Sequence, residues 1–262
     1  MSKDRIPDHS VTGHGDDTVF LLHGAFGAKE YWREQIAALS QAGYRVVAWD
    51  CPGYGCSPLP ADFSVETCAR AFGRLLDKEA GPRNIVLGHS MGGMIAQRAY
   101  DYFGDRIHGL ILSATSAAFG SPDGEWQRKF VADRVAPLDA GRSVAEHAHD
   151  FLPQMMAPGA AGPAVDLVVD TVALMRPETF RAAIVAITQY EGRAVLPKMK
   201  VPVLAIAGEL DKTAPADVMA KMAGKIAGAE FVSMPGVAHF GWAEQPAVFN
   251  AHILDFLKRR LG

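Results

Sequence analysis

The most constraining feature of this sequence is the stretch Leu87 to Gly93, LGHSMGG, which centres on Ser90. The apolar residues 85–87 before it are typical of a buried strand, and residues 91–100 have the apolar periodicity of a helix. A serine in so sharp a turn adopts a strained backbone, and glycine at positions 88 and 92 avoids collisions between strand and helix. The stretch therefore predicts a turn that lifts the Ser90 hydroxyl clear of a sheet, beside the amides of a helix N-terminus.

Taken alone, this Gly-x-Ser-x-Gly pattern is weak evidence, because glycine and serine are common residues. A plain glycine-rich connection between a strand and a helix explains the pattern equally well. Evidence that separates these two interpretations must come from the rest of the chain.

Strands and helices alternate from residue 18 to residue 113. Buried-type strands are predicted at 18–22, 45–49, 85–87 and 108–112, with helices at about 30–41, 65–78 and 91–100. This alternation is typical of a parallel sheet with helices on both faces. Reactive groups of such sheets lie at the carboxyl ends of the strands, where His23, Asp50 and Ser90 fall.

The pattern changes between about residues 119 and 190, where no strand-like run occurs. Pro163 and Pro177 suit the first turns of two helices, and the second helix is expected to extend to about Gln189. Two further strands, at 203–207 and 230–234, then resume the sheet. We predict an α/β fold with a mostly parallel central sheet, comprising a core domain of residues 1–118 and 191–262 and a helical cap inserted at residues 119–190.

Composition restricts the partners and the compartment. A net charge of -3 gives no excess of positive charge that would attract nucleic acid or an anionic membrane. The three cysteines cannot all pair and form no CxxC motif, which indicates free thiols rather than a disulfide framework or a thiolate metal site. Residues 1–10 are polar, and no apolar run is long enough to cross a bilayer. We expect a cytoplasmic monomer or homodimer that acts on a small molecule and binds neither nucleic acid nor membrane.

An acid and a histidine complete a catalytic constellation with Ser90. Asp211 and His239 each follow a predicted strand of the same sheet. A serine hydroxyl is a poor nucleophile at neutral pH, and the imidazole of His239 suits the base that it needs. Asp211 would hold that imidazole in the correct tautomer. Attack on a carbonyl also builds charge on oxygen, and the backbone N–H groups of Ala25 and Met91 are placed to stabilise it. This chemistry needs neither a metal nor an organic cofactor.

The motifs resemble those of the α/β-hydrolase superfamily over nearly the whole chain. LLHGAFG resembles the oxyanion loop, WDCPGYGCS the D-x-x-G-x-G-x-S loop, GHSMGG the nucleophile elbow, AIAGELDKTAP the acid loop, and VAHF the segment of the base. Within the superfamily, GHSMGGMIAQ and AIAGELD look most like the ester and lactone hydrolases typified by 3-oxoadipate enol-lactonase. Haloalkane dehalogenases and epoxide hydrolases carry aspartate where this chain has Ser90, which argues against their chemistry.

The resemblance implies a serine hydrolase that cleaves a small carboxylic ester or lactone through an acyl-enzyme. One alternative is a carbon-carbon bond hydrolase of aromatic ring-fission products, although its relatives usually show HGSGPG and a GNS elbow, from which this chain departs. Another is a non-catalytic ligand-binding member of the fold. Apolar residues near the three loops and in the insertion are predicted to line the substrate pocket: Phe26, Trp126, Phe151, Phe240 and Trp242. Helix packing is the competing explanation for those in the insertion.

Other candidates receive a structural interpretation. Glu209 precedes Asp211 by two residues, and only Asp211 occupies the position of the family's acid. His89 is expected to face away from the reacting groups, and Asp50 to fix its own loop. His147 and His149 are two residues apart and so lie on different helix faces, which argues against a metal site.

Overall fold

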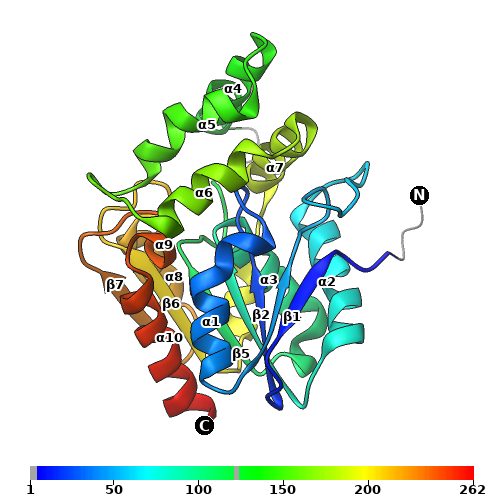
Figure 1. Ribbon diagram of the computed structural model, residues 1–262. Helices are drawn as coiled ribbons and strands as arrows, with labels where there is room; N and C mark the ends of the chain where they lie inside the picture. The colour runs from blue at the N-terminus through cyan, green and yellow to red at the C-terminus, as the bar shows by residue number, and fades with distance from the viewer. Residues whose placement is uncertain (1–4, 121–123) are drawn as a thin grey trace.

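The fold is a seven-stranded sheet between two layers of helices, shown in the computed structural model of Figure 1, which describes residues 5–120 and 124–262. The strands are β1 (His9–Thr12), β2 (Asp17–Leu22), β3 (Arg45–Trp49), β4 (Arg83–His89), β5 (Gly109–Ser113), β6 (Val203–Gly208) and β7 (Glu230–Met234). Their spatial order is β1-β3-β2-β4-β5-β6-β7, with β1 antiparallel to β3 and the other neighbours parallel. The predicted α/β fold is confirmed.

The helices of the core cover both faces of the sheet because each has one apolar side. They are α1 (Arg33–Gln41), α2 (Val65–Glu79), α3 (Met91–Phe103), α8 (Ala216–Ala223), α9 (Gly241–Glu244) and α10 (Pro246–Leu261). Helices α1 and α10 pack together on one face, and α2 packs against α3 on the other (Figure 1). Ser64 caps α2 by accepting a hydrogen bond from the Thr67 amide at 3.1 Å.

Helices α4 to α7 form the insertion between β5 and β6, above the carboxyl edge of the sheet (Figure 1). Their bounds are α4 (Glu125–Asp139), α5 (Val144–Phe151), α6 (Pro163–Ala173) and α7 (Pro177–Gln189), so the predicted starts at Pro163 and Pro177 are confirmed. Helix α6 contacts the core at the short helix Lys29–Trp32 and at α9. The insertion therefore lies against the same edge of the sheet as the candidate catalytic residues.

The two ends of the insertion meet at a narrow neck. Ala118 and Glu191 form an antiparallel bridge, and the Gly192 amide donates a hydrogen bond to the Ala117 carbonyl at 2.7 Å. The division into domains at residues 118/119 and 190/191 stays a prediction. Residues 1–4 of the predicted core and 121–123 of the predicted cap lie outside the described residues.

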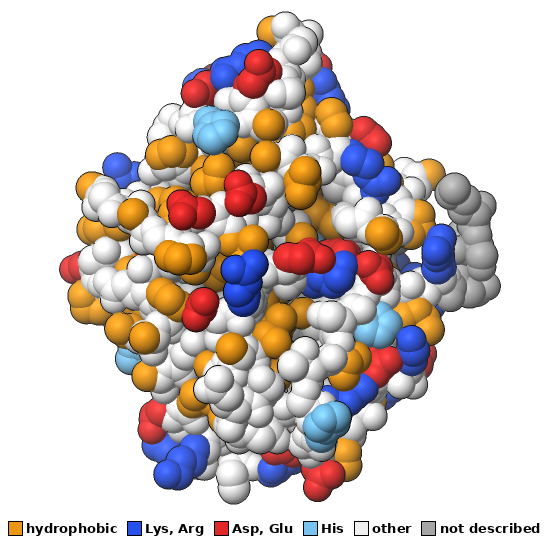
Figure 2. Space-filling view, viewed as in Figure 1, with side chains coloured by type: hydrophobic (Ala, Val, Ile, Leu, Met, Phe, Trp, Pro, Cys, Tyr) orange, Lys and Arg blue, Asp and Glu red, His pale blue; other side chains and the backbone are white. Residues whose placement is uncertain are grey.

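The visible surface carries charges of both signs. Figure 2 shows acidic and basic side chains interspersed over the face seen in Figure 1. Within residues 5–120 and 124–262, no helix is both long and apolar enough to cross a membrane.

Cys51, Cys56 and Cys68 are free, as predicted, with Cys56 exposed and the other two buried.

Candidate active site

Ser90 lies in a strained turn between β4 and α3. Its backbone angles are φ 53° and ψ -118°, a region that residues with a side chain seldom adopt. Its amide donates a hydrogen bond to the Ser113 carbonyl on β5 at 2.9 Å, which anchors the turn to the sheet. A Cβ at position 88 would lie 2.3 Å from the Gly92 carbonyl oxygen, and one at position 92 would lie 2.1 Å from that of Leu22. The turn thus requires glycine at both positions, as the sequence indicates.

His239 and Asp211 form a buried pair at the same edge of the sheet. The imidazole Nδ1 of His239 lies 2.8 Å from Oδ2 of Asp211, and the second carboxylate oxygen accepts hydrogen bonds from the amides of Thr213 at 2.7 Å and Ala214 at 3.0 Å. These contacts place the ring proton on Nδ1 and leave Nε2 free to accept a proton. Burial opposes ionisation of Asp211, but His239 and the two amides outweigh it and hold the carboxyl pKa below its usual value.

The pair lies beside the Ser90 turn. The ring centroid of His239 is 4.9 Å from that of His89, the residue before Ser90. His89 is itself buried, with Nδ1 3.3 Å from the Ser113 hydroxyl, and burial together with nearby His239 lowers its pKa well below the usual value. His89 is therefore a neutral ring that packs beneath the site. The structure brings Ser90, Asp211 and His239 to one edge of the sheet, where the sequence predicts them.

The loop after β2 approaches the same turn. A Cβ at position 24 would lie 3.1 Å from the Ser90 Cβ, so glycine allows the loop to pass directly beside the serine. The Gly24 amide donates to the Tyr31 hydroxyl at 2.8 Å, and the Tyr54 hydroxyl donates to the Ala25 carbonyl at 2.9 Å. Within the described part of the chain, the amides of Ala25 and Met91 donate no hydrogen bond of their own. Their predicted role in stabilising a negative oxygen stays a prediction.

Two anchors hold this loop from below. The buried imidazole of His23 accepts a hydrogen bond from the Cys51 amide through Nε2 at 2.9 Å, so its Nδ1 donates to the Gly24 carbonyl at 2.8 Å. Burial lowers the His23 pKa, which keeps this arrangement neutral. Asp50 accepts from the Lys29 amide at 2.9 Å and pairs with the Lys29 ammonium at 2.5 Å. Asp50 thus fixes the end of the loop after β2 and not only its own loop.

Glu244, on α9, is a supporting residue that the sequence analysis does not identify. Its carboxylate accepts hydrogen bonds from the amides of Ala238 at 3.1 Å, Phe240 at 3.0 Å and Ala157 at 2.9 Å. The first two flank His239, and the third belongs to the insertion. Because no Ser, Thr, Asp or Asn precedes α9 in a capping-box pattern, the sequence carries no signal for this contact.

The five predicted pocket residues lie in three places. Phe26, in the loop after β2, contacts Phe151 of α5 with ring centroids 4.8 Å apart. Phe180 of α7 and His147 of α5 complete this cluster, and the sequence analysis predicts neither as a pocket residue. His147 is 6% exposed and its Nε2 has no partner among the described residues, and burial lowers its pKa. The cluster joins the insertion to the loop beside Ser90.

Phe240 and Trp242 are fully buried next to the histidines. The Phe240 ring lies 5.3 Å from that of His239, while Trp242 packs on Tyr31 at 4.2 Å and on Trp32 at 4.9 Å. Trp242 therefore belongs to an aromatic stack beneath the loop after β2. Its predicted place in the substrate pocket stays a prediction.

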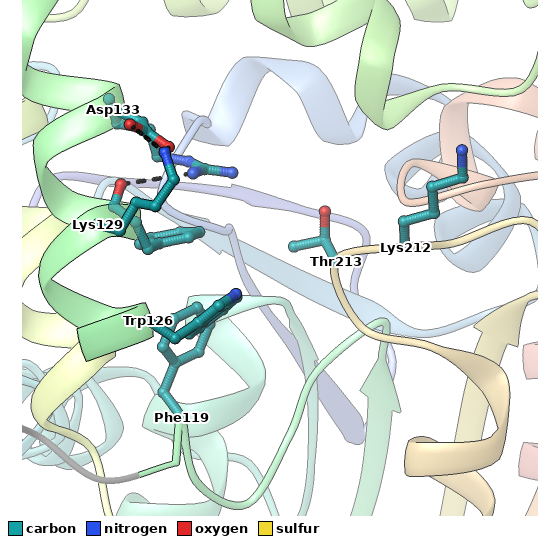
Figure 3. A pocket seen from close by; sticks show the side chains of 8 residues that line it. Phe119, Trp126, Lys129, Asp133, Lys212 and Thr213 are labelled. Atoms are coloured by element: carbon teal, nitrogen blue, oxygen red, sulfur yellow. Dashed lines mark hydrogen bonds and ion pairs between the residues drawn. The ribbon is translucent and has the colours of Figure 1, made fainter. Parts of the chain in front are cut away.

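Trp126 lines a separate cavity of about 250 Å³ between α4 and the loop after β6. Figure 3 shows Lys212 and Thr213 on one side of it, with Trp126, Lys129 and Asp133 on the other. Lys212 and Thr213 directly follow Asp211, so this cavity adjoins the acid loop. Among the described residues, no group of three His, Cys, Asp or Glu side chains is placed to hold a metal ion.

Comparison with known proteins defines the class. A family model described as "Alpha/beta hydrolase family" matches residues 19–252, and the chain belongs to this family. It is 32% identical over 259 residues to "Putative carbamate hydrolase RutD" of Variovorax paradoxus, covering 96% of each chain. It is 27% identical over 244 residues to the pimeloyl-[acyl-carrier protein] methyl ester esterase of Neisseria meningitidis, covering 92% of this chain and 93% of the relative. The structure resembles the enol-lactonase of Burkholderia xenovorans with a TM-score of 0.84, 25% identity and 96% coverage of both chains.

Proposed function

We propose that the protein is a serine hydrolase that cleaves a small carboxylic ester or lactone through an acyl-enzyme. The observation that carries the proposal is the buried contact of 2.8 Å between His239 and Asp211 beside the strained turn of Ser90. Strain at a non-glycine residue costs about 1–3 kcal/mol, and such positions concentrate at functional sites. The similar proteins are named as a methyl ester esterase, an enol-lactonase and a putative carbamate hydrolase, and cleavage of an ester, a lactone or a carbamate begins with attack at a carbonyl carbon, which supports the same class of reaction here.

Each step of the proposed reaction has a group on this chain. Nε2 of His239 takes the proton of the Ser90 hydroxyl as Oγ attacks the substrate carbonyl, and Asp211 stabilises the resulting imidazolium. The amides of Ala25 and Met91 donate to the negative oxygen of the tetrahedral intermediate. The alcohol or enolate leaves with the proton held by His239, and the acyl group remains on Ser90. Water, deprotonated by His239, then releases the acid and restores the serine.

The first test measures initial rates on a panel of substrates with the wild type, Ser90→Ala and Asp211→Asn. The panel contains short-chain nitrophenyl esters, simple lactones, an enol-lactone, a carbamate and a ring-fission dienone. Ser90→Ala should abolish turnover of esters or lactones, whereas the exposed control Ser233→Ala should not alter it. Asp211→Asn should lower kcat by about 10⁴-fold, because the neutral amide no longer selects the productive tautomer of His239.

The same panel separates the alternatives. Turnover restricted to the dienone would assign carbon-carbon bond hydrolysis instead. A non-catalytic ligand-binding protein would turn over nothing and would leave Ser90 unlabelled by a fluorophosphonate. Either result would overturn the proposed ester or lactone hydrolysis.

A further inference from the structure

We propose that Thr115, the second residue after β5, is a positioning residue for the Ser90 turn. Its hydroxyl holds the peptide group whose N–H, on Met91, is the predicted donor to the negative oxygen of the intermediate. The inference rests on the proposed function and deepens it, because it assigns a role at the same site to a residue outside the triad. Three features beside Ser90 support it: a hydrogen bond, a close approach and a strained residue.

The hydrogen bond joins Thr115 to the backbone of the serine. The buried Thr115 hydroxyl donates to the Ser90 carbonyl at 2.7 Å, and this carbonyl also accepts from the amides of Gly93 at 2.9 Å and Met94 at 3.2 Å. The two amides belong to α3 itself, whereas Thr115 follows a different strand and so ties the group to the sheet. Because a peptide group is planar, fixing the Ser90 carbonyl also fixes the direction of the Met91 N–H. A hydrogen bond to the carbonyl further polarises the group and strengthens its N–H as a donor.

The close approach explains the last glycine of the LGHSMGG stretch. A Cβ at position 93 would lie 2.6 Å from the Cβ of Thr115 and 2.7 Å from its hydroxyl oxygen. Both separations are too short for a van der Waals contact, so glycine at this position lets Thr115 reach the start of α3. Glycines 88 and 92 serve the turn itself, and Gly93 serves the contact with a residue 25 positions after Ser90.

The strained residue is Ala114, which directly precedes Thr115. Among the residues that the structure describes, Ala114 at φ 44° and Ser90 at φ 53° are the two non-glycine residues with positive φ. The Ala114 amide donates to the Ile206 carbonyl on β6 at 2.9 Å, as the Ser90 amide does to Ser113 on β5. Strain of this kind persists where the surroundings over-determine it, and it concentrates at functional sites. The two strained turns follow neighbouring strands, and the Thr115 hydroxyl connects them.

The other predicted donor has the same arrangement. The Ala25 N–H shares a peptide group with the Gly24 carbonyl, which accepts from Nδ1 of buried His23 at 2.8 Å. Each predicted donor thus lies on a peptide group whose carbonyl is bonded by a buried side chain. Donors that are fixed in advance stabilise developing charge without reorienting during the reaction. Loss of the Thr115 hydroxyl should therefore weaken stabilisation of the transition state rather than binding of the substrate.

The test compares Thr115→Val, which replaces the hydroxyl by a methyl group, with Thr115→Ser, which keeps the hydroxyl. On the best ester, Thr115→Val should lower kcat about tenfold with KM changed by less than about twofold, and Thr115→Ser should retain at least about half of the wild-type kcat. The loss is smaller than the roughly 100-fold typical of removing a donor, since the Met91 N–H remains. Thr115→Ala removes the hydroxyl without adding volume and should give the same loss, so a packing defect of valine does not decide the result.

Thr188→Val is the matched control. The Thr188 hydroxyl is also buried and also donates to a carbonyl, that of Val185, at 2.7 Å, but it lies on α7 in the insertion. Its removal should leave kcat unchanged.

A change of the substrate's carbonyl atom separates positioning from a general structural loss. In a thionoester, sulfur replaces the carbonyl oxygen, and sulfur is a weak hydrogen-bond acceptor. The rate ratio of an oxygen ester to its thionoester therefore reports on the donors. This ratio should fall by about the same factor as kcat in Thr115→Val and stay unchanged in Thr188→Val. Loosening of the structure as a whole would slow both substrates equally.

The outcomes keep the two proposals apart. If the wild type hydrolyses esters but Thr115→Val and Thr115→Ala match Thr188→Val, the role of Thr115 is refuted and the proposed function stands. A lower kcat with an unchanged oxygen-to-sulfur ratio would refute it as well. If the dienone alone is turned over and its kcat falls about tenfold in Thr115→Val, the proposed ester or lactone hydrolysis fails and the role of Thr115 stands, because attack on a ketone also builds charge on oxygen. Both fail if the wild type turns over nothing and Ser90 resists the fluorophosphonate.

Discussion

The carboxylate of Glu244 holds the backbone on both sides of His239, and Glu244→Gln tests how much this contributes to stability and to the reaction rate. Its oxygens serve three backbone donors, on Ala157, Ala238 and Phe240, and all three of these residues are buried. Glutamine keeps the shape of the side chain but offers one oxygen, while its NH₂ group faces at least one of the donors. A buried donor left without a partner costs about 1–3 kcal/mol, and a neutral acceptor bonds less strongly than a carboxylate.

We therefore expect Glu244→Gln to lower the free energy of unfolding by about 2 kcal/mol, measured by urea denaturation and tryptophan fluorescence. It should also lower kcat on the best ester about tenfold, because Ala238 and Phe240 flank His239 and small displacements of a catalytic base are costly. Glu209→Gln is the matched control. Glu209 is exposed and accepts one backbone hydrogen bond, from Gly236 at 3.0 Å, so its loss should be no more than about 0.5 kcal/mol. Equal stability and equal kcat for the two variants would refute the supporting role of Glu244.

Two further predictions concern protons and thiols. Burial lowers the pKa of His23, His89 and His147 below 6.5, so the unfolded chain binds more protons and stability falls as pH decreases below about 6.5. His147→Phe retains a ring in the cluster and should reduce this dependence, by no more than about 1.4 kcal/mol per pH unit, in urea denaturation below about pH 6.5; an unchanged slope would contradict the neutral state of His147. Burial also raises the pKa of the Cys51 thiol, and Cys68 is buried beside it, so a disulfide-exchange reagent should titrate only Cys56 rapidly in the native protein and all three thiols in denaturant. Rapid reaction of Cys51 in the native state would show that its surroundings open.

The parts of the fold that sequence analysis predicts are those controlled by local pattern. Buried parallel strands are continuous apolar runs, and the residues that follow them must lie at one edge, so the order Ser90, Asp211, His239 already implies their meeting. Proline at the start of a helix is equally local, which explains the success at Pro163 and Pro177. Strand β1 has no continuous apolar run, because its side chains are half-buried or exposed, and its pairing with β3 defines it instead.

The parts that could not be predicted depend on how separate elements pack. Phe180 and His147 meet Phe26 only because α5 and α7 lie over the loop after β2, and helical periodicity does not say which neighbour a face will contact. Trp126 is a residue type that often packs in the core, but here it lines a cavity. Its surroundings depend on where α4 lies relative to Lys212, which a local sequence pattern does not specify. The same holds for Glu244, because its donor Ala157 lies in a distant segment of the chain.

The bridge between Ala118 and Glu191 has an evolutionary consequence. Because the two ends of the insertion pair with each other outside the sheet, its length and sequence can change without displacing β5 or β6. The entropy of closing such a segment grows only slowly with its length, by about 0.6 kcal/mol for each doubling. Drift or recombination confined to these helices could therefore reshape substrate preference while the reacting groups keep their inherited geometry. Relatives with the same chemistry and unrelated substrates are the expected outcome of such an architecture.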